Sequence, residues 1–212
     1  MKGLFITFEG TEGSGKTTII NNLKEELESK GYDVITTREP GGGKIAEQIR
    51  DVLLNVDNTK MDKITEALLY AASRRQHLAE VVVPNLQQGK IVLCDRYLDS
   101  SLVYQGYARG IGFEKVYEIN QFATEGIMPD LTIYIDVYPS VGFKRINENH
   151  RNQNRLDLET RSFHKLVYEG YQKLIQKFPK RIKVVDGEKP LLEVCEQVNN
   201  IIFSYLEKNY VF

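Results

Sequence analysis

Residues 10–17 combine glycine, lysine and threonine at the spacing of a phosphate-binding loop. They read Gly-Thr-Glu-Gly-Ser-Gly-Lys-Thr, and the last two are Lys16 and Thr17. Glycines at these positions allow successive backbone N–H groups to converge on phosphate oxygens. Lys16 is placed to reach the outer phosphates of a nucleotide, and Thr17 offers a hydroxyl to Mg²⁺. The loop therefore predicts a nucleoside triphosphate site and is silent on the phosphate acceptor. The residues expected to contact the triphosphate are Gly10, Thr11, Glu12, Gly13, Ser14, Gly15, Lys16, Thr17 and Thr18.

The segments on either side of this loop predict a strand before it and a helix after it. Residues 4–8 form an apolar run of residue types that favour strands. Beyond the loop, apolar residues recur at helical spacing, at Ile19, Leu23 and Leu27. The alternative, a chance glycine-rich turn, accounts for neither segment. Strand, loop and helix in this order are the context that a phosphate-binding loop requires.

An acid and an arginine follow the strand-like run at residues 90–94. Asp95 is well placed for the hydration shell of Mg²⁺ beside a triphosphate, or else it caps the next turn. Arg96 is either an exposed charge or, beside a phosphate loop, a clamp for a second phosphate group. Three more segments carry candidate arginines, at Arg38, Arg50 and Arg74.

Tyr70 and Arg74 are four residues apart in a helical pattern and therefore share one helical face. Together they can present an aromatic plane and hydrogen-bond donors to one flat ligand. The alternative is a partly buried tyrosine packed by an arginine stem, which is common on helices. Spacing alone leaves both interpretations open.

Strand-like runs alternate with helical patterns along the whole chain. The strand-like runs lie at 4–8, 32–37, 90–94, 131–136 and 182–186. The helical patterns lie at about 16–30, 45–54, 62–88, 113–126, 139–149, 157–178 and 190–208. This alternation predicts a three-layer α/β fold, a five-stranded parallel sheet flanked by helices, with ligands at the carboxyl ends of its strands. We expect one domain over residues 1–212, with a mobile, arginine-bearing lid at about 145–157.

Composition narrows the possible partners. The formal net charge of -1 provides no general attraction for nucleic acid or for an anionic membrane. No apolar run approaches the length of a membrane span. The first residues run straight into the first predicted strand, so we expect no signal peptide. Cys94 and Cys195 lie far apart, and the three histidines lack metal-ligand spacing. We therefore expect a cytoplasmic protein without a structural metal.

Four motifs, in this order, resemble the thymidylate kinase family. They are FEGTEGSGKT at 8–17, TREPGG at 37–42, LYAASR at 69–74 and DRYLDSSLVYQG at 95–106. The fourth is highly specific to that family. The resemblance runs from residue 4 to about residue 160 and is weaker in the C-terminal helices. It implies a nucleoside monophosphate kinase fold and a reaction in which Mg-ATP phosphorylates dTMP to dTDP, a step in dTTP synthesis.

The resemblance also implies roles for particular side chains. Glu12 resembles the acid that holds the 3′-hydroxyl of the acceptor sugar. Tyr70 occupies the position that stacks on thymine, where Phe is frequent, and Arg74 the position that donates to a thymine carbonyl. The implied dTMP-binding residues are Glu12, Arg38, Glu39, Arg50, Tyr70, Ser73, Arg74, Arg96, Ser100, Ser101 and Gln105. The implied catalytic residues are Lys16, Asp95, Arg96, Arg151 and Arg155, with Thr17 and Asp95 at Mg²⁺, directly or through water.

The position of the basic residues resembles one group within the family. The phosphate loop carries no base at its variable positions 11–14, whereas the lid region carries Arg145, Arg151 and Arg155. This arrangement resembles the bacterial members with lid arginines. Which of Arg151 and Arg155 reaches the triphosphate is open, and a solvated surface charge is the alternative for each. The family further implies a homodimer with the 62–88 region at the contact.

Two other functions remain open at this level. One is a kinase on the same scaffold that phosphorylates a nucleoside or a different monophosphate. The other is a nucleotide-dependent switch, which would hydrolyse slowly and show no acceptor-stimulated release of ADP. Arginines on several segments favour a second anionic substrate over a switch. We therefore expect two small-molecule substrates, dTMP and ATP, and no nucleic acid.

Overall fold

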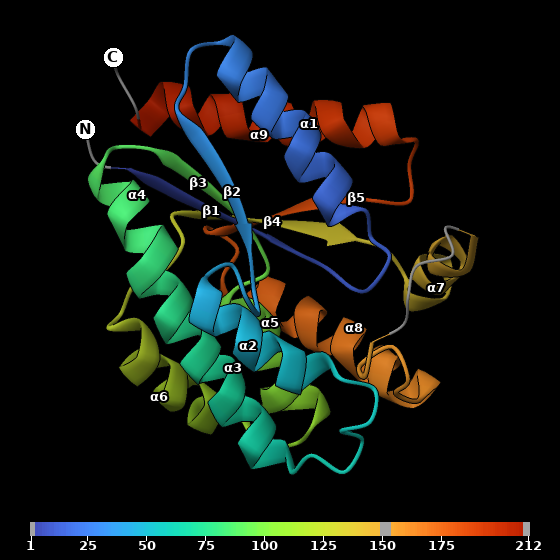
Figure 1. Ribbon diagram of the computed structural model, residues 1–212. Coiled ribbons are helices and arrows are strands. Elements are labelled where there is room, and N and C mark those ends of the chain that lie inside the picture. Colours follow the sequence, from blue (N-terminus) through green and yellow to red (C-terminus); the bar gives the residue numbers. More distant parts are fainter. Residues whose placement is uncertain (1–2, 149–153, 210–212) are drawn as a thin grey trace.

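A five-stranded parallel sheet lies between two layers of helices in the computed structural model, which describes residues 3–148 and 154–209 (Figure 1). The strands are β1 (Leu4–Glu9), β2 (Val34–Arg38), β3 (Ile91–Asp95), β4 (Leu131–Asp136) and β5 (Ile182–Asp186). Their order in the sheet is β2-β3-β1-β4-β5. All five predicted strands are confirmed, and so is the parallel α/β architecture.

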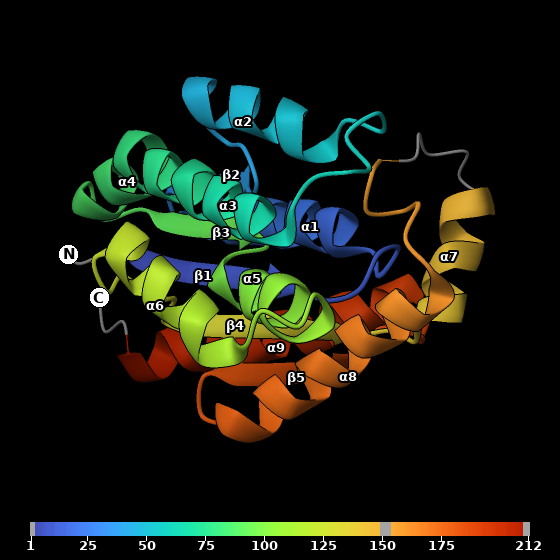
Figure 2. The ribbon, with the colours of Figure 1, turned by 90° about the horizontal axis from the view of Figure 1, so that it is seen from below.

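Helices cover both faces of the sheet. They are α1 (Lys16–Ser29), α2 (Lys44–Leu54), α3 (Lys63–His77), α4 (Val83–Gln87), α5 (Leu98–Ser101), α6 (Phe113–Thr124), α7 (Pro139–Glu148), α8 (Arg161–Lys177) and α9 (Leu191–Asn209). Two π-helical segments are η1 (Leu78–Val82) and η2 (Leu102–Ala108). Figure 1 shows α1 and α9 above the sheet, and Figure 2 shows α3, α6 and α8 on the opposite side. Among the described residues, no helix is both long and apolar enough to cross a membrane.

Each face of the sheet buries its own set of apolar side chains. Successive residues of a strand point to opposite faces. Leu4, Ile6 and Phe8 of β1 therefore pack into the cluster formed with α1 and α9. Phe5, between them, packs into the cluster that includes residues of α3, η2 and α8. The sheet is thus held from both sides, and the loops at its carboxyl edge extend from a rigid base.

Residues 98–108 form a helical segment that the sequence pattern did not predict. α5 and η2 follow one another there, and most of their side chains are buried. A segment enclosed on all sides has no polar face, so it lacks the periodicity by which a surface helix is recognised. The wide π-helical winding of η2 is a form that often occurs at functional sites.

The predicted helix at 62–88 is confirmed as an unbroken succession of α3, η1 and α4. The winding widens at η1, which ends two residues before Pro84. A proline ring would clash with a carbonyl of the preceding turn in a regular α-helix, and the wider turn gives the ring room. The predicted helix at 157–178 begins later, at Arg161, because Thr160 caps it: Thr160 Oγ1 accepts a hydrogen bond from Phe163 N at 3.2 Å.

Candidate active site

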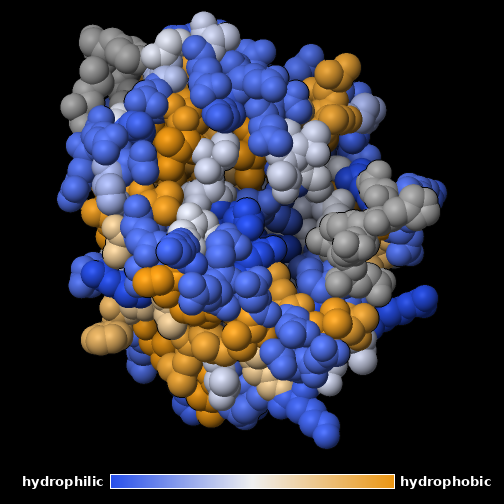
Figure 3. All heavy atoms as spheres, viewed as in Figure 1, coloured by the Kyte–Doolittle hydropathy of each residue, from blue (hydrophilic) through white to orange (hydrophobic). Residues whose placement is uncertain are grey.

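A cleft of about 420 Å³ lies at the carboxyl ends of β1, β2 and β3. The parallel register explains why these ends meet: Phe8 pairs with Asp95, and Asp95 pairs with Arg38. The segments that follow the three strands therefore leave the sheet at one edge. A cleft of this volume is typical of a small-molecule site. Figure 3 shows hydrophilic side chains gathered in the hollow between α1 and α2.

The structure brings most of the predicted nucleotide-binding residues to this cleft. Those that line it are Glu12, Gly13, Ser14, Gly15, Lys16, Thr17, Thr18, Arg38, Glu39, Arg50, Tyr70, Arg74, Asp95, Arg96, Ser100, Ser101 and Gln105. Among the predicted residues that the structure describes, four do not line it, namely Gly10, Thr11, Ser73 and Arg155. The chemical role of each residue remains a prediction.

The phosphate loop turns tightly and touches α7. Gly15, at the N-terminal cap of α1, has a φ of 87°, in the left-handed region that favours glycine. A Cβ on Gly13 would lie 2.1 Å from the carbonyl oxygen of Gly142 in α7, and a Cβ on Gly142 would lie 2.1 Å from the carbonyl oxygen of Glu12. The two backbones therefore lie so close together that a side chain at either glycine would overlap the opposite backbone.

Lys16 folds over the loop that precedes it. Its Nζ donates hydrogen bonds to Gly10 O at 3.2 Å, to Thr11 O at 3.0 Å and to Ser14 Oγ at 3.1 Å. Burial, and then the charge of Arg96, lower the pKa of Lys16 from 10.5 to about 8. An anion in the cleft would offset both causes, so the lysine is prepared to receive phosphate.

The expected Mg²⁺ ligands contact one another. Thr17 Oγ1 donates a hydrogen bond to Asp95 Oδ2 at 2.9 Å, which leaves the lone pairs of Thr17 for a metal. Among the described residues, no group of three or more His, Cys, Asp or Glu side chains forms a metal site of its own. This set fits an ion that arrives with a triphosphate, because Mg²⁺ commonly uses one or two protein oxygens together with phosphates and waters.

Arg96 crosses the cleft in a strained backbone conformation. Its φ is 69°, which is rare for a residue with a side chain. Nη2 donates to Glu12 Oε1 at 3.0 Å, and Nη1 lies 3.3 Å from both Ser100 Oγ and Tyr171 Oη. The guanidinium also lies over the ring of Tyr104, at 5.3 Å from its centroid. Contacts on three sides thus hold one cation at the mouth of β3 beside Lys16.

Glu12 is the buried anion opposite Arg96. Both of its carboxylate oxygens accept from Tyr104 Oη at 2.8 Å, and His164 Nδ1 lies 3.8 Å away. Burial alone would raise the pKa of Glu12, but the charges of Arg96 and Lys16 outweigh it and hold the pKa below its usual value. Tyr104 lies within the fourth sequence motif, yet its contact with Glu12 could not be predicted from that motif, because the contact depends on tertiary structure.

Glu9, the last residue of β1, organises the segment after Arg96. Its Oε1 accepts from the backbone N of Tyr97 at 2.8 Å and of Ser100 at 3.3 Å. Its Oε2 accepts from Ser100 Oγ at 2.6 Å and from Tyr171 Oη at 2.8 Å. Since Ser100 and Tyr171 are also the hydroxyls that meet Arg96, Glu9 fixes the guanidinium indirectly. Sequence reasoning did not assign a role to Glu9.

Glu9 is expected to make stability depend on pH near neutrality. Burial, and then the charge of Asp99, raise the pKa of Glu9 from 4.5 to about 7. A raised carboxyl pKa contributes stability below the unfolded value and loses it as the pH rises through the folded value. Glu9→Gln lacks this carboxyl group, so its free energy of unfolding should not fall in the same way. Between about pH 5 and about pH 8, the wild type should lose on the order of 3 kcal/mol of stability relative to Glu9→Gln. Urea unfolding of both proteins measures this, and a difference that stays constant with pH would contradict it.

Arg74 lies in a buried network beneath the far end of the cleft. Its Nε donates to Glu39 Oε2 at 2.7 Å, and the side chains are 1% and 2% exposed. Nη1 donates to Ser101 Oγ at 2.9 Å and to Asn120 Oδ1, and Nη2 donates to Tyr97 O at 3.0 Å. Four of the five N–H groups of Arg74 therefore have partners among the described residues, which leaves one on Nη2 for a ligand.

Two residues expected at the nucleotide support their neighbours. Ser73 is fully buried, and its Oγ accepts from Gly41 N at 3.1 Å. It lies one residue before Arg74, about 100° around the helix, and so faces the loop after β2 and not the cleft. Glu39 lines the cleft, but its Oε1 lies 3.0 Å from His77 Nδ1 while its Oε2 holds Arg74. We infer that both residues act by positioning.

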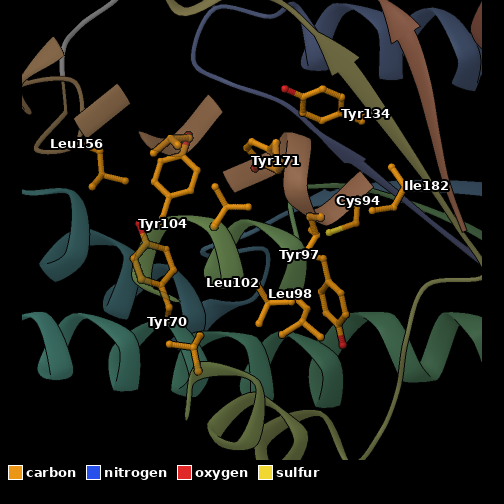
Figure 4. Packing of buried hydrophobic residues seen from close by; sticks show 14 of the residues in the cluster. Tyr70, Cys94, Tyr97, Leu98, Leu102, Tyr104, Tyr134, Leu156, Tyr171 and Ile182 are labelled. Atoms are coloured by element: carbon orange, nitrogen blue, oxygen red, sulfur yellow. The ribbon is translucent and has the colours of Figure 1, made fainter. Parts of the chain in front are cut away.

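Tyr70, Arg38 and Arg50 complete the cleft wall. Tyr70 is 8% exposed, and Figure 4 shows it extending from α3 toward Tyr104. Arg38 Nη2 donates to both carboxylate oxygens of Glu47, at 2.9 Å and 3.0 Å, and the arginine side chain is half exposed. Arg50 Nη1 donates to Pro40 O at 2.7 Å. Both arginines are thus fixed by single partners and retain donors for an anion.

The predicted lid arginines occupy different environments. Arg145 belongs to α7, lines the cleft and donates from Nη1 to Gly187 O at 3.0 Å. Arg155 is 3% exposed, with Nε donating to Leu53 O at 2.7 Å and Nη2 lying 2.7 Å from Glu66 Oε2. The alternative for Arg155, a solvated surface charge, is therefore wrong, because a buried carboxylate binds it. Its catalytic role stays a prediction. Arg151 lies outside the described residues, and the mobility of the lid remains a prediction.

Comparisons with known proteins agree with this geometry. The family model described as thymidylate kinase matches residues 8–198. The thymidylate kinase of Bacillus pumilus (strain SAFR-032) is 59% identical over 212 residues, which are the whole of both chains. The thymidylate kinase of Clostridium novyi (strain NT) is 58% identical over 95% of this chain and 98% of its own length.

The fold is likewise similar to a solved structure. The crystal structure of thymidylate kinase from Ehrlichia chaffeensis superposes with a TM-score of 0.78 at 31% sequence identity. The match covers 95% of this chain and 100% of the other. Sequence and fold therefore lead to the same set of relatives.

Proposed function

Because this chain belongs to the thymidylate kinase family and phosphorylates dTMP to dTDP with ATP, a step toward dTTP, we propose how its cleft divides between the two nucleotides. The proposal rests on one observation: a single cleft joins the phosphate loop to a second compartment bounded by Tyr70, Arg74 and Gln105. ATP enters from the loop side, and dTMP occupies the second compartment.

The acceptor compartment offers a partner for each part of dTMP. Tyr70 stacks on the base, and the remaining N–H of Arg74 donates to its 4-carbonyl. Glu12 lies between Lys16 and Tyr104, where the 3′-hydroxyl of the sugar would reach a carboxylate. Arg38, Arg50 and Arg96 surround the place of the acceptor phosphate. Each of these three arginines already has a protein partner and also retains free donors. The phosphate therefore adds to contacts such as that between Arg38 and Glu47, or replaces them.

A second hollow of about 380 Å³ provides for the other end of ATP. It shares Ser14, Gly15, Thr18 and Arg145 with the cleft and is also bounded by Lys189 and Leu191. A triphosphate along the loop would therefore lead from the cleft into this hollow. We assign the adenine and its ribose to it, with apolar side chains of α1 and α9 against the base.

Mg²⁺ is proposed at Thr17 and Asp95, which fit an ion carried in by the phosphates. The ion, when bound, would neutralise charge between the outer phosphates of ATP. Loss of activity in a chelator, and its return with added magnesium, tests this assignment.

The chemical difficulty of the reaction is the repulsion between two negatively charged nucleotides, and the cationic residues of the cleft offset it. A phosphate monoester has a second pKa of about 6, so dTMP is largely a dianion at neutral pH and needs no general base. Arg96 lies close enough to Lys16 to lower its pKa, and both cations lower the pKa of Glu12. Two fixed cations offset the repulsion between the nucleotides and stabilise the charge of the in-line transition state.

A homodimer through the outer faces of α3 and α6 is part of the proposal. Ile64 and Leu68 of α3 are 52% and 51% exposed, and Phe122 of α6 is 90% exposed. Figure 3 shows apolar surface over the region where Figure 1 places these helices. Exposed apolar side chains gathered in one region favour a protein contact. Sedimentation velocity of the wild type and of Phe122→Asp tests it, and a monomeric wild type would refute it.

The choice of acceptor is expected to follow hydrogen bonding at the base. With ATP, dTMP should be the best acceptor, and dUMP should be about tenfold to a hundredfold poorer because it lacks only a methyl group. The loss with dCMP should be about 10⁴-fold, since its 4-amino group faces the donor of Arg74 and both stay unpaired. Coupled assays of ADP release with each monophosphate measure these ratios.

The same assays separate the rival functions. Release of ADP without acceptor measures the slow hydrolysis that a switch would show, and a nucleoside acceptor tests for a nucleoside kinase. Equal turnover of dCMP and dTMP would refute the role of Arg74, and release of ADP that no monophosphate stimulates would refute the acceptor site.

A further inference from the structure

Glu66, Tyr70 and Arg74 form one stripe along α3 that faces the acceptor compartment. They are spaced four residues apart, so their side chains lie one above the other on the same helical face. Tyr70 and Arg74 line the cleft, whereas Glu66 lies behind it and is 1% exposed. A carboxylate buried this deeply, outside the reaction centre, requires partners that offset its burial.

The partners of Glu66 come from two segments, η2 with its C-terminal cap Arg109 and the stretch before α8 that carries Arg155. Oε1 accepts from Gln105 Nε2 at 2.8 Å and from Arg109 Nε at 3.2 Å. Oε2 accepts from Arg109 Nη2 at 3.1 Å and lies 2.7 Å from Arg155 Nη2. Burial would raise the pKa of Glu66, but hydrogen bonds from Arg109 and Gln105 outweigh it and hold the pKa below its usual value. The side chain is therefore ionised at neutral pH and can only accept hydrogen bonds.

This chemistry removes one of the two orientations of the Gln105 side-chain amide. An ionised carboxylate accepts from the NH₂ group and repels the carbonyl oxygen, so Nε2 must face Glu66. Gln105 lines the cleft, and its Oε1 has no hydrogen-bond donor among the described residues. The amide therefore presents an acceptor, and not a donor, to whatever base enters.

We propose that Glu66 is a specificity-determining positioning residue, which locks the Gln105 amide so that its carbonyl oxygen selects a base carrying N3–H. The inference rests on the acceptor site proposed above. Thymine and uracil have a hydrogen on N3 and satisfy Oε1, whereas cytosine presents a lone pair at N3 that Oε1 repels. Arg74 recognises the 4-position of the base, and the Gln105 amide recognises N3 beside it. Two residues of the same helical face, Arg74 and Glu66, therefore determine which base binds.

Glu66→Gln is the informative substitution. A glutamine at this position offers both a donor and an acceptor, so the Gln105 amide can turn and present NH₂ to cytosine N3. We expect kcat/KM for dTMP to fall while that for dCMP is unchanged or rises, so that their ratio falls about tenfold or more. A structural role alone would lower both values equally, and an unchanged ratio would overturn the proposal.

Three further variants isolate the mechanism. Glu66→Asp keeps an acceptor-only partner and should retain the wild-type ratio even if turnover falls. Glu159→Gln removes a second carboxylate from Arg109, at 2.6 Å in the wild type, without touching Gln105, and should leave the ratio unchanged. In the Gln105→Met background, Glu66→Gln should change the ratio no further. A further fall of the same size in that background would show that Glu66 acts through another residue.

One measurement on the wild type decides the case where Glu66→Gln does not fold. The Nε2 protons of Gln105, identified in ¹⁵N spectra by their absence in Gln105→Met, should exchange with solvent more slowly than those of surface glutamines. Exchange as fast as at the surface would place NH₂ in the open cleft and overturn the proposal. Turnover of dTMP by the wild type tests the acceptor site separately.

Discussion

Lys16→Ala is expected to lower kcat by about 10³-fold or more while the protein remains folded. Lys16 supplies positive charge where the phosphates meet, and no other lysine lines the cleft along the part of the chain that the structure describes. Burial and the nearby Arg96 disfavour the charged form of Lys16, so the substitution removes an electrostatic cost. The substitution also removes three hydrogen bonds from the lysine to the loop, and the two effects oppose each other. We expect stability to change by only about 1 kcal/mol.

Steady-state kinetics and thermal unfolding of the same preparation test this. Lys24→Ala is the matched control, because Lys24 lies on the same helix and forms an exposed i,i+4 pair with Glu28. It should change neither quantity measurably. A folded Lys16→Ala protein with a rate near that of the wild type would remove the phosphate loop from the mechanism.

Arg96→Met is expected to lower both activity and stability. The substitution removes a cation from the place of the acceptor phosphate, and kcat/KM for dTMP should fall by about 10³-fold. It also leaves Glu12, whose side chain is 8% exposed, without its ion-pair partner. Breaking a buried pair from one side costs about 3 kcal/mol, which lowers the melting temperature by several degrees. Lys16→Ala and Arg96→Met thus differ in stability even though both are nearly inactive.

A second substitution separates the two effects. Adding Glu12→Gln to Arg96→Met removes the unpaired charge and should recover part of the stability but none of the activity. Arg75→Met is the control, since Arg75 and its partner Glu125 are largely exposed and such pairs contribute little. A melting temperature of Arg96→Met equal to that of the wild type would refute the ion-pair argument.

The sequence was most informative where local pattern decides structure. All five strands follow from apolar runs, and the phosphate loop follows from Gly15, Lys16 and Thr17 together with the strand and helix on either side. Asp95 and Arg38 could be placed at one edge because parallel strands end together. These inferences needed no knowledge of which side chains touch.

The sequence was least informative where partners come from distant segments. Ser73 and Arg155 have the right type and spacing for a ligand contact, yet Gly41 and Glu66 respectively bind them away from the cleft. Glu9, Tyr104 and Glu66 were not assigned because their importance is a property of the buried network and not of a motif. A buried polar group is recognised only when all of its hydrogen-bond partners are known.

The contact between Gly13 of the phosphate loop and Gly142 of α7 has an evolutionary consequence. Every replacement for glycine adds a Cβ, and at either position that atom would overlap backbone, which cannot rotate away as a side chain can. A drifting lineage therefore cannot compensate a change at one position by a change at the other, since both already have the smallest possible residue. Adaptive variation, including resistance to an inhibitor that occupies this junction, is confined to the neighbours of the pair.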